Sequence, residues 1–236
     1  MRKEVTFAGV SLATYGVYIS GSGVFNAPIR AYNEITIPGR NGILLGNEKR
    51  LENIEVTYPA FVYSNFAQNM RNLRGFLLSK VGYYELSDTY HTDEYRMACY
   101  MGGLEVEPTT KLDAGNFDIT FNCKPQRYLN SGKTSTTIAA SGSTTISNPT
   151  LFDARPLIRA YGTGSFEVNG VTVTISTSLG YTDIDCDTMD CFYSVYNRNQ
   201  YVSFSSINFP VLSPGSNAVT NGLSGNLVIT PRWWTV

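Results

Sequence analysis

The residues of this chain that could do chemistry are few and scattered. His91 is the only histidine, and it lies in a polar stretch between Tyr90 and Thr92. Any Ser-His or Cys-His site would need His91 as its base, yet no nucleophile motif surrounds a serine or a cysteine. We therefore expect His91 to be an exposed loop residue, and we expect the chain not to be an enzyme.

The densest acidic cluster is the sequence YTDIDCDTMDCF, with aspartates at positions 183, 185, 187 and 190. Its spacing resembles the beginning of an EF-hand calcium loop. Such a loop starting at Asp183 requires glycine at position 188 and glutamate at position 194, but these residues are Thr188 and Ser194. We instead expect a strand over 181–185, a tight polar turn at 187–190 and a returning strand, with no metal.

The four cysteines are Cys99, Cys123, Cys186 and Cys191. Cys186 and Cys191 could form half of a zinc site, but no second pair of ligands stands at zinc spacing. No run of signal-peptide character opens the sequence, so we expect free thiols in a protein made in the cytoplasm. The sequence also contains no phosphate-binding glycine loop, and we predict no cofactor.

Aromatic and arginine residues near the C-terminus raise the alternative of sugar binding. Trp233 and Trp234 could stack on a saccharide, as could Arg155, Arg159 and Arg232 beside aromatic residues. Core packing and contact between subunits explain tryptophans in a terminal strand at least as well. A glycosidase needs two carboxylates about 5 to 9.5 Å apart, and nineteen acidic residues neither support nor exclude such a pair.

The composition favours a protein that buries surface against partners. Aromatic residues make up 13% of the chain and charged residues only 16%, against about 25% charged residues in an average domain. The net charge of −1 gives the whole chain no attraction to nucleic acid or to an anionic membrane. No stretch reaches the roughly 18 apolar residues of a membrane span, so we expect no membrane insertion.

The elements that must position these residues are mainly β-strands. Residues 1–130 are expected to form an antiparallel β domain with one helix over 64–79, where Phe66, Met70, Leu73 and Leu77 share one face and Ser64 is the N-cap. Phe117–Cys123 alternates apolar and polar residues, as a half-buried strand does. The turn dipeptides Pro38-Gly39 and Asn41-Gly42 predict that the chain doubles back into 43–45.

Residues 131–147 are dominated by Ser, Thr, Gly and Ala, and we expect a linker or a hydrophilic strand there. Residues 148–236 then read as strands separated by regular turn signals, of which Asn169-Gly170 is the strongest. This pattern is typical of a β-sandwich. The predicted organisation is therefore a β domain at 1–130, a linker at 131–147 and a sandwich at 148–236.

The order of several short motifs resembles the distal tail protein family of long, non-contractile-tailed bacteriophages. These motifs span almost the whole chain: IPGRNG at Ile37–Gly42, the helix at 64–79, CKPQRY at Cys123–Tyr128, NPTLFDARPLIRAYGTG from Asn148, VNG at Val168–Gly170, YTDIDCD at Tyr181–Asp187, the FPVL-x-PG-x-N block at Phe209–Asn217 and ITPRWW at Ile229–Trp234.

The resemblance implies a structural hub of the phage tail tip. Family members form a hexameric ring through the first domain, around the path of the ejected DNA, which passes without specific binding. The ring joins the tail-tube protein to tail-tip or baseplate proteins. The second domain would be a galectin-like sandwich on which receptor-binding proteins dock. The protein would be assembled in the host cytoplasm and located in the virion.

On this resemblance we expect ring or hub contacts at Ile37, Pro38, Gly39, Arg40, Asn41 and Gly42. Docking or sugar contacts are expected at Trp233 and Trp234. The alternative function is a carbohydrate-binding β-sandwich protein that mediates adhesion to the host surface.

Overall fold

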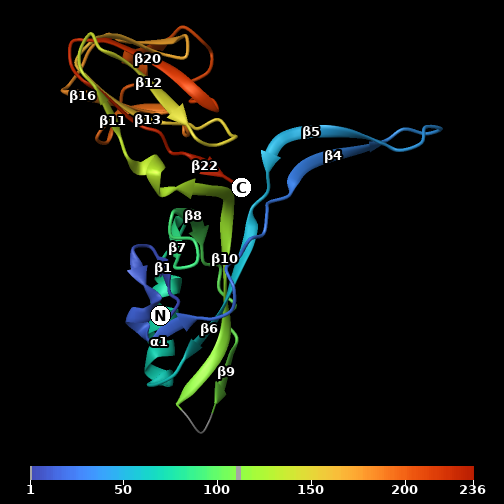
Figure 1. Cartoon of the computed structure of the whole chain (residues 1–236). Helices are drawn as coiled ribbons and strands as arrows, with labels where there is room; N and C mark the ends of the chain where they lie inside the picture. The colour runs from blue at the N-terminus through green and yellow to red at the C-terminus, as the bar shows by residue number, and fades with distance from the viewer. Residues whose placement is uncertain (1, 110–112) are drawn as a thin grey trace. The chain divides into compact units, whose positions relative to one another are not determined.

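The structure, a computed structural model, describes residues 2–109 and 113–236 and divides the chain into two compact units. The first unit extends to Arg127 and the second runs from Tyr128 to Thr235. Figure 1 shows both units to be built almost entirely of strands, which confirms the mainly β fold class. Among the described residues, no helix is long and apolar enough to cross a membrane.

The first unit is an antiparallel sheet with one α-helix. The strand order is β2-β1-β7-β8-β10-β6-β3, and β9 also pairs with β10. The elements are β1 (Val5–Phe7), β2 (Val10–Ser11), the 3-10 helix η1 (Leu12–Tyr15), β3 (Val17–Ile19), β4 (Arg30–Thr36), β5 (Ile43–Leu51), β6 (Ile54–Val62), α1 (Phe66–Ser79), β7 (Tyr84–Asp88), β8 (Glu94–Cys99), β9 (Val106–Thr109) and β10 (Ala114–Leu129).

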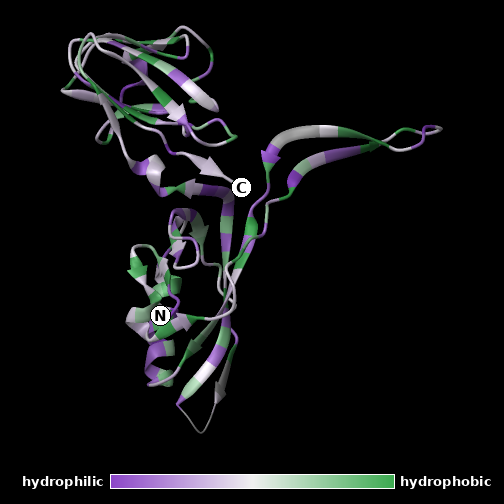
Figure 2. Cartoon of the chain, in the orientation of Figure 1, coloured by the Kyte–Doolittle hydropathy of each residue, from purple (hydrophilic) through white to green (hydrophobic). Residues whose placement is uncertain are grey.

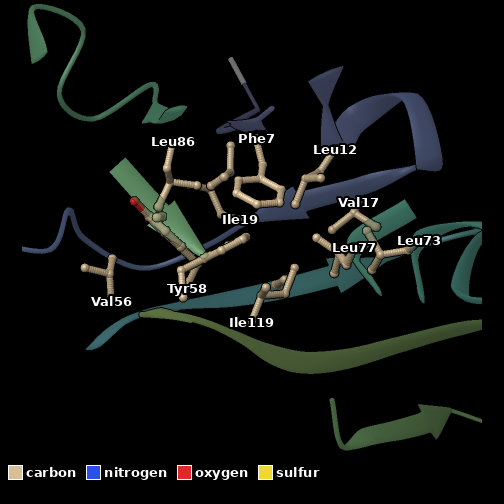
Figure 3. Close-up of a cluster of buried hydrophobic side chains, with 14 of the residues drawn as sticks. Phe7, Leu12, Val17, Ile19, Val56, Tyr58, Leu73, Leu77, Leu86 and Ile119 are labelled. Atoms are coloured by element: carbon tan, nitrogen blue, oxygen red, sulfur yellow. The ribbon is translucent and has the colours of Figure 1, made fainter. Parts of the chain in front are cut away.

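Period-2 patterning builds the core of this unit. In β6 the residues Ile54, Val56 and Tyr58 are buried while their neighbours are exposed, and β10 repeats the pattern from Phe117 to Cys123. Strands β6 and β10 pair directly, so their inward side chains lie next to one another. Figure 3 shows Tyr58 and Ile119 converging with Phe7 and the helix residues on one cluster. The strand predicted over Phe117–Cys123 is confirmed.

The predicted helix is confirmed, but its predicted N-cap is wrong. Met70, Leu73 and Leu77 are buried, as the apolar stripe predicts. The N-cap position belongs to Asn65 instead of Ser64, and the Asn65 side chain makes no capping hydrogen bond. The carboxylate of Asp113 accepts hydrogen bonds from the backbone N–H groups of Asn65 (2.7 Å) and Phe66 (3.0 Å). A residue distant in sequence therefore satisfies the orphan N–H groups of the first turn.

The second unit is a sandwich of two antiparallel sheets around a shared core. The sheets have the orders β11-β21-β13-β16-β17-β18 and β12-β20-β14-β15-β19. The elements are η2 (Asn130–Lys133), β11 (Thr136–Ile138), β12 (Ser143–Asn148), β13 (Leu157–Tyr161), β14 (Gly164–Val168), β15 (Val171–Ile175), β16 (Tyr181–Asp185), β17 (Asp190–Tyr193), β18 (Tyr196–Asn197), η3 (Asn199–Tyr201), β19 (Val202–Phe204), β20 (Gly215–Leu223), β21 (Leu227–Thr230) and β22 (Trp234–Thr235).

The segment expected to be a linker or a hydrophilic strand, residues 131–147, contributes strands β11 and β12 to this sandwich and is not a linker. Two buried asparagines of β20 explain the difference. The side-chain amide of Asn221 donates to the carbonyl oxygens of Ile138 and Ala139, and that of Asn217 donates to Ile146. Ile138 and Ile146 also point into the core. These partners are remote in sequence, so the polar composition of the segment alone suggested a linker.

Candidate functional site: an exposed hairpin and an aromatic sheet face

Strands β4 and β5 form a two-stranded sheet that pairs with no other described strand. Within the first unit, Figure 1 shows this hairpin extending away from the strands that carry the core. In β4, Ala31 is buried and the following positions are exposed. The hairpin is therefore a surface with very little support from the rest of the unit.

Both faces of the hairpin expose apolar side chains. Ile35 stands opposite Leu44 on one face, while Thr36 with Ile43 and Glu34 with Leu45 alternate on the other. Leu44 is 50% exposed, and Ile43 and Leu45 are exposed to a similar degree. Figure 2 shows this hydrophobic stretch in both strands near the tip. An isolated hairpin is marginally stable in water, so these two strands alone give the hairpin little stability.

The predicted contact residues Ile37 to Gly42 form the tip of this hairpin. The Arg40 backbone N–H donates to the Ile37 carbonyl at 3.2 Å, which closes a turn through Pro38 and Gly39. Gly39 has a φ of 78° and Gly42 a φ of 83°, in the region that side chains with a Cβ disfavour. The chain reversal predicted from Pro38-Gly39 and Asn41-Gly42 is thus confirmed, and residues 38–42 are exposed.

The two tryptophans do not form an open stacking platform. Trp233 is 5% exposed and belongs to the core of the sandwich. The ring of Trp234 stacks on Phe152 with centroids 4.3 Å apart, and its indole N–H donates to the Asp153 carbonyl at 2.9 Å. Their aromatic faces are largely occupied by the protein itself.

A row of tyrosines lies instead on the sheet that contains β13, β16 and β17. The Tyr161 and Tyr181 ring centroids are 6.0 Å apart, and those of Tyr181 and Tyr193 are 4.7 Å apart. The guanidinium of Arg159 lies 4.3 Å from the Tyr181 centroid and donates two hydrogen bonds to Asp183. We call these residues the tyrosine face. The sequence predicted strands in the segments that contain these tyrosines. It did not predict how the strands pair, and it is the pairing register that places Tyr161 opposite Tyr181.

The acidic run adopts the strand, turn and strand that the sequence predicts, as β16 and β17. Asp183 pairs with Arg159, and Asp185 accepts two hydrogen bonds from Arg232 at 2.7 and 3.0 Å. Burial alone would raise the pKa of Asp185, but Arg232 and the backbone N–H groups of Asp187 and Thr188 outweigh it and lower that pKa. Among the described residues no group of three ligating side chains could hold a metal ion.

His91 lies in the loop between β7 and β8, as predicted, but the prediction that it is exposed is wrong. Its Nδ1 lies 3.1 Å from an oxygen of Asp88, and its ring meets that of Phe25 edge-on at 4.9 Å. The Asp88 carboxylate also accepts the backbone N–H groups of Tyr90 and His91, which closes the turn around the histidine. Asp88 stands only three residues before His91, but Phe25 comes from a separate segment, so the polar neighbours in sequence did not reveal this packing.

All four cysteines are free thiols, and three of them are buried. Burial is the main cause that raises the pKa of Cys123, Cys186 and Cys191 to about 12 each. These three thiols are therefore protonated near neutral pH, and a protonated thiol is a poor nucleophile and metal ligand.

No protein-family model matches the sequence, and no curated protein matches it. Solved structures do share its fold. The SPP1 Dit (gp 19.1) protein, described as a paradigm of hub adsorption apparatus in Gram-positive infecting phages, matches with a TM-score of 0.74 and 15% identity over 100% of both chains. A chain of the phage p2 baseplate in its activated conformation with Sr matches with a TM-score of 0.54 and 12% identity, over 97% of this chain and 96% of that one.

The two structures confirm the resemblance indicated by the sequence motifs at the level of the fold. Full coverage of the SPP1 Dit chain means that both units, not the sandwich alone, have counterparts there. At such low identity, side chains are not carried over from these structures. The chain has, from end to end, the fold of a phage Dit protein.

Proposed function

We propose that this protein is a structural hub of a bacteriophage tail tip. It forms a hexameric ring that joins the tail tube to baseplate or receptor-binding proteins. The observation that carries this proposal is the β4–β5 hairpin, which exposes apolar side chains on both faces within a chain that has the Dit fold. The named neighbours are a hub protein and a baseplate component, which supports a location in the virion tail.

The hairpin supports assembly from identical copies. Ile35, Leu44 and Leu45 leave apolar area in water that contact with a second copy would remove, at about 25 cal/mol for each Å² buried. When a hairpin of one copy rests on a different surface of the next, the contact is heterologous, and such contacts generate rings when the rotation closes. The tip, residues 37–42, is then a ring contact.

A channel for DNA follows from the same arrangement. DNA passes through the ring without specific binding, because a conduit with many basic contacts would hold phosphate groups. The outward positions of β10 from Asn116 to Lys124 are Asn116, Asp118, Thr120, Asn122 and Lys124, of which only Lys124 is basic. The net charge of −1 over the whole chain supports the same interpretation.

The partners are those of a hub. The ring contacts the tail-tube protein on one side and a tail-tip or tail-associated protein on the other, and the second unit carries the receptor-binding protein. The role is structural and not enzymatic. Assembly takes place in the host cytoplasm before lysis.

The mass of the purified protein in solution tests the proposal. We expect a hexamer by light scattering and a ring by negative-stain electron microscopy. Leu44→Asp, which places a charge on the apolar hairpin, should shift the population to monomer without loss of secondary structure by circular dichroism. Leu151→Asp is the matched control, because Leu151 is 88% exposed in a loop of the second unit, and it should leave the ring intact.

A wild-type protein that stays monomeric at high concentration, with no ring in the images, would contradict the proposal. If the Leu44→Asp variant still forms rings, the hairpin is not the ring contact, although the protein remains a ring-forming hub.

The tyrosine face favours one alternative, a carbohydrate-binding sandwich that mediates adhesion to the host surface. Aromatic rings beside a fixed arginine–carboxylate pair offer stacking surface together with directed hydrogen bonds. A saccharide array decides between the two. Binding that Tyr181→Ala abolishes, in a protein that forms no ring, would favour the adhesion protein over the hub.

A further inference from the structure

The sequence contains three Asn-Gly dipeptides, which begin at Asn41, Asn169 and Asn221. In such a dipeptide the asparagine side chain is next to a backbone nitrogen whose residue has no Cβ, so the side-chain amide and this nitrogen can approach each other without a clash. Asparagine is a thermolabile residue, because the nitrogen of the following residue can attack its side-chain amide carbon. How firmly the fold holds each of the three amides therefore decides whether it reacts.

The sandwich holds two of the three asparagine side chains. The amide of Asn169 donates to the Val211 carbonyl at 3.1 Å, and its Oδ1 accepts the Ala218 N–H at 3.1 Å. Asn221 is 2% exposed, and its side-chain amide donates to three carbonyl oxygens at 3.0 Å each. Either amide would have to break these hydrogen bonds before it could rotate toward the nitrogen of its glycine.

The third asparagine has no such restraint. Asn41 and Gly42 are both exposed, at the end of the β4–β5 hairpin (Figure 1). Among the residues that the structure describes, none forms a hydrogen bond with the Asn41 side chain. A Cβ built on Gly42 meets no atom within 4 Å, so the space around the dipeptide is open. The Asn41 amide is therefore free to rotate toward the Gly42 nitrogen.

We propose that Asn41 is a site of spontaneous deamidation, with the Gly42 backbone nitrogen as the nucleophile. This nitrogen attacks Cγ of Asn41, so that a bond between the nitrogen and Cγ forms. The bond between Cγ and Nδ2 breaks, and Nδ2 leaves as ammonia with the proton of the Gly42 N–H. The product is a cyclic succinimide.

Water completes the reaction by adding to one of the two succinimide carbonyls. Opening at the side-chain carbonyl leaves aspartate at position 41. Opening at the backbone carbonyl leaves isoaspartate, in which the main chain runs through Cγ. Neither step needs an oxidant, a reductant or a metal, so water is the only co-reactant.

Both products place a carboxylate, which is ionised near neutral pH, beside the exposed apolar residues Ile43 and Leu44. Isoaspartate also adds one atom to the main chain just before β5. What this does to assembly rests on the proposed function. If the hairpin is the ring contact, each copy in a ring brings the new charge to the same contact, so deamidated chains assemble less well. A ring that covers the tip in turn protects Asn41.

Peptide mass spectrometry of the full-length Leu44→Asp variant tests the site itself. The tip of this variant is uncovered in either case, because the substitution disrupts a contact made by the hairpin and is irrelevant to a ring built without it. During incubation in heavy-oxygen water at mildly alkaline pH, the Asn41 peptide should convert to aspartate and isoaspartate that carry one heavy oxygen. Asn169 and Asn221 should remain amides, because their reaction requires local opening of the sandwich.

An unchanged Asn41 peptide would overturn the proposal, and so would conversion of Asn169 at the same rate as Asn41. Asn41→Gln, made in the same Leu44→Asp background, is the matched control. It keeps an exposed amide at position 41 but requires a larger ring for the attack, so it should lose the acidic shift on ion-exchange chromatography. A control that becomes acidic as fast as its parent would also overturn the proposal.

The wild-type protein separates this inference from the proposed function. Slower conversion of Asn41 in the wild type than in Leu44→Asp is the expected result, because the assembled ring covers the tip. Equal conversion of Asn41 in the two proteins would leave the deamidation site in place and contradict the hairpin as the ring contact.

Discussion

The hairpin β4–β5 and the hairpin β14–β15 both contain an Asn-Gly dipeptide, Asn41-Gly42 in the first and Asn169-Gly170 in the second. In the second, both turn residues have positive φ, 50° and 80°, as a two-residue turn between paired strands requires. Its strands bury Phe166, Val168, Val173 and Ile175 in the sandwich. In the first, six residues join the strands, and apolar side chains remain exposed on both faces.

The difference teaches what a local turn signal specifies. A turn dipeptide predicts that the chain reverses, but the surface that covers the strands comes from elsewhere. For β14–β15 that surface lies within the same unit. For β4–β5 the described chain supplies none, which is why we assign its surface to a second copy of the protein.

The largest expected effect is on the free energy of unfolding, and it should differ between substitutions in the two hairpins. Phe166→Ala removes a ring that is 2% exposed, so we expect the second unit to lose about 3–5 kcal/mol of its free energy of unfolding. The fluorescence of Trp233 and Trp234, the only tryptophans, reports on that unit during urea unfolding.

Leu44→Ala is the counterpart in the free hairpin. It should change the stability of the monomer by less than about 0.5 kcal/mol, because Leu44 packs on no core. Comparable losses for the two substitutions, followed by circular dichroism, would show that the β4–β5 hairpin belongs to the cooperative core of the first unit.

The pH dependence of the sandwich should give an intermediate effect. The lowered pKa of Asp185 means that its ion pair with Arg232 stabilises the folded state above the ordinary aspartate pKa of about 3.9. This stability is lost as the pH falls through the lower pKa of the folded state. Asp185→Asn should cost about 1.5–3 kcal/mol at pH 7 and flatten the acid dependence of unfolding.

Asp153→Asn controls for the general loss of a negative charge, because Asp153 is exposed in a loop of the same unit. It should leave both the stability and the acid dependence close to those of the wild type. An Asp185→Asn variant that unfolds with the wild-type pH profile would exclude this ion pair as the cause.

Periodicity and turn chemistry predicted the elements whose burial depends on their own sequence. The stripe of Met70, Leu73 and Leu77 and the alternation from Phe117 to Cys123 each lie within one element, and both are confirmed. The tip at Ile37–Gly42 was likewise readable from its dipeptides. The exposure of its strands could not be predicted from these dipeptides, because exposure depends on whether the rest of the chain covers the strands.

The misses share one physical cause, a partner remote in sequence. Asp113 caps α1 from beyond the next three strands, Asn221 and Asn217 hold β11 and β12, and Phe25 packs against His91. The tyrosine face depends likewise on strand register. No pattern within a single segment encodes such contacts.

The smallest effect should come from the turn glycines themselves. Gly42 and Gly170 have similar φ values, 83° and 80°, and a Cβ built on either meets no atom within 4 Å. Alanine at either position therefore suffers the same backbone strain, about 1–2 kcal/mol. Gly170→Ala should lower the stability of the sandwich by that amount, measured by tryptophan fluorescence. Gly42→Ala should leave unfolding of the first unit unchanged and instead weaken the ring, because its strain falls on the hairpin that we propose as the ring contact. Equal losses of unfolding free energy, with no change in oligomer mass, would mean that both hairpins are stabilised within their own chain.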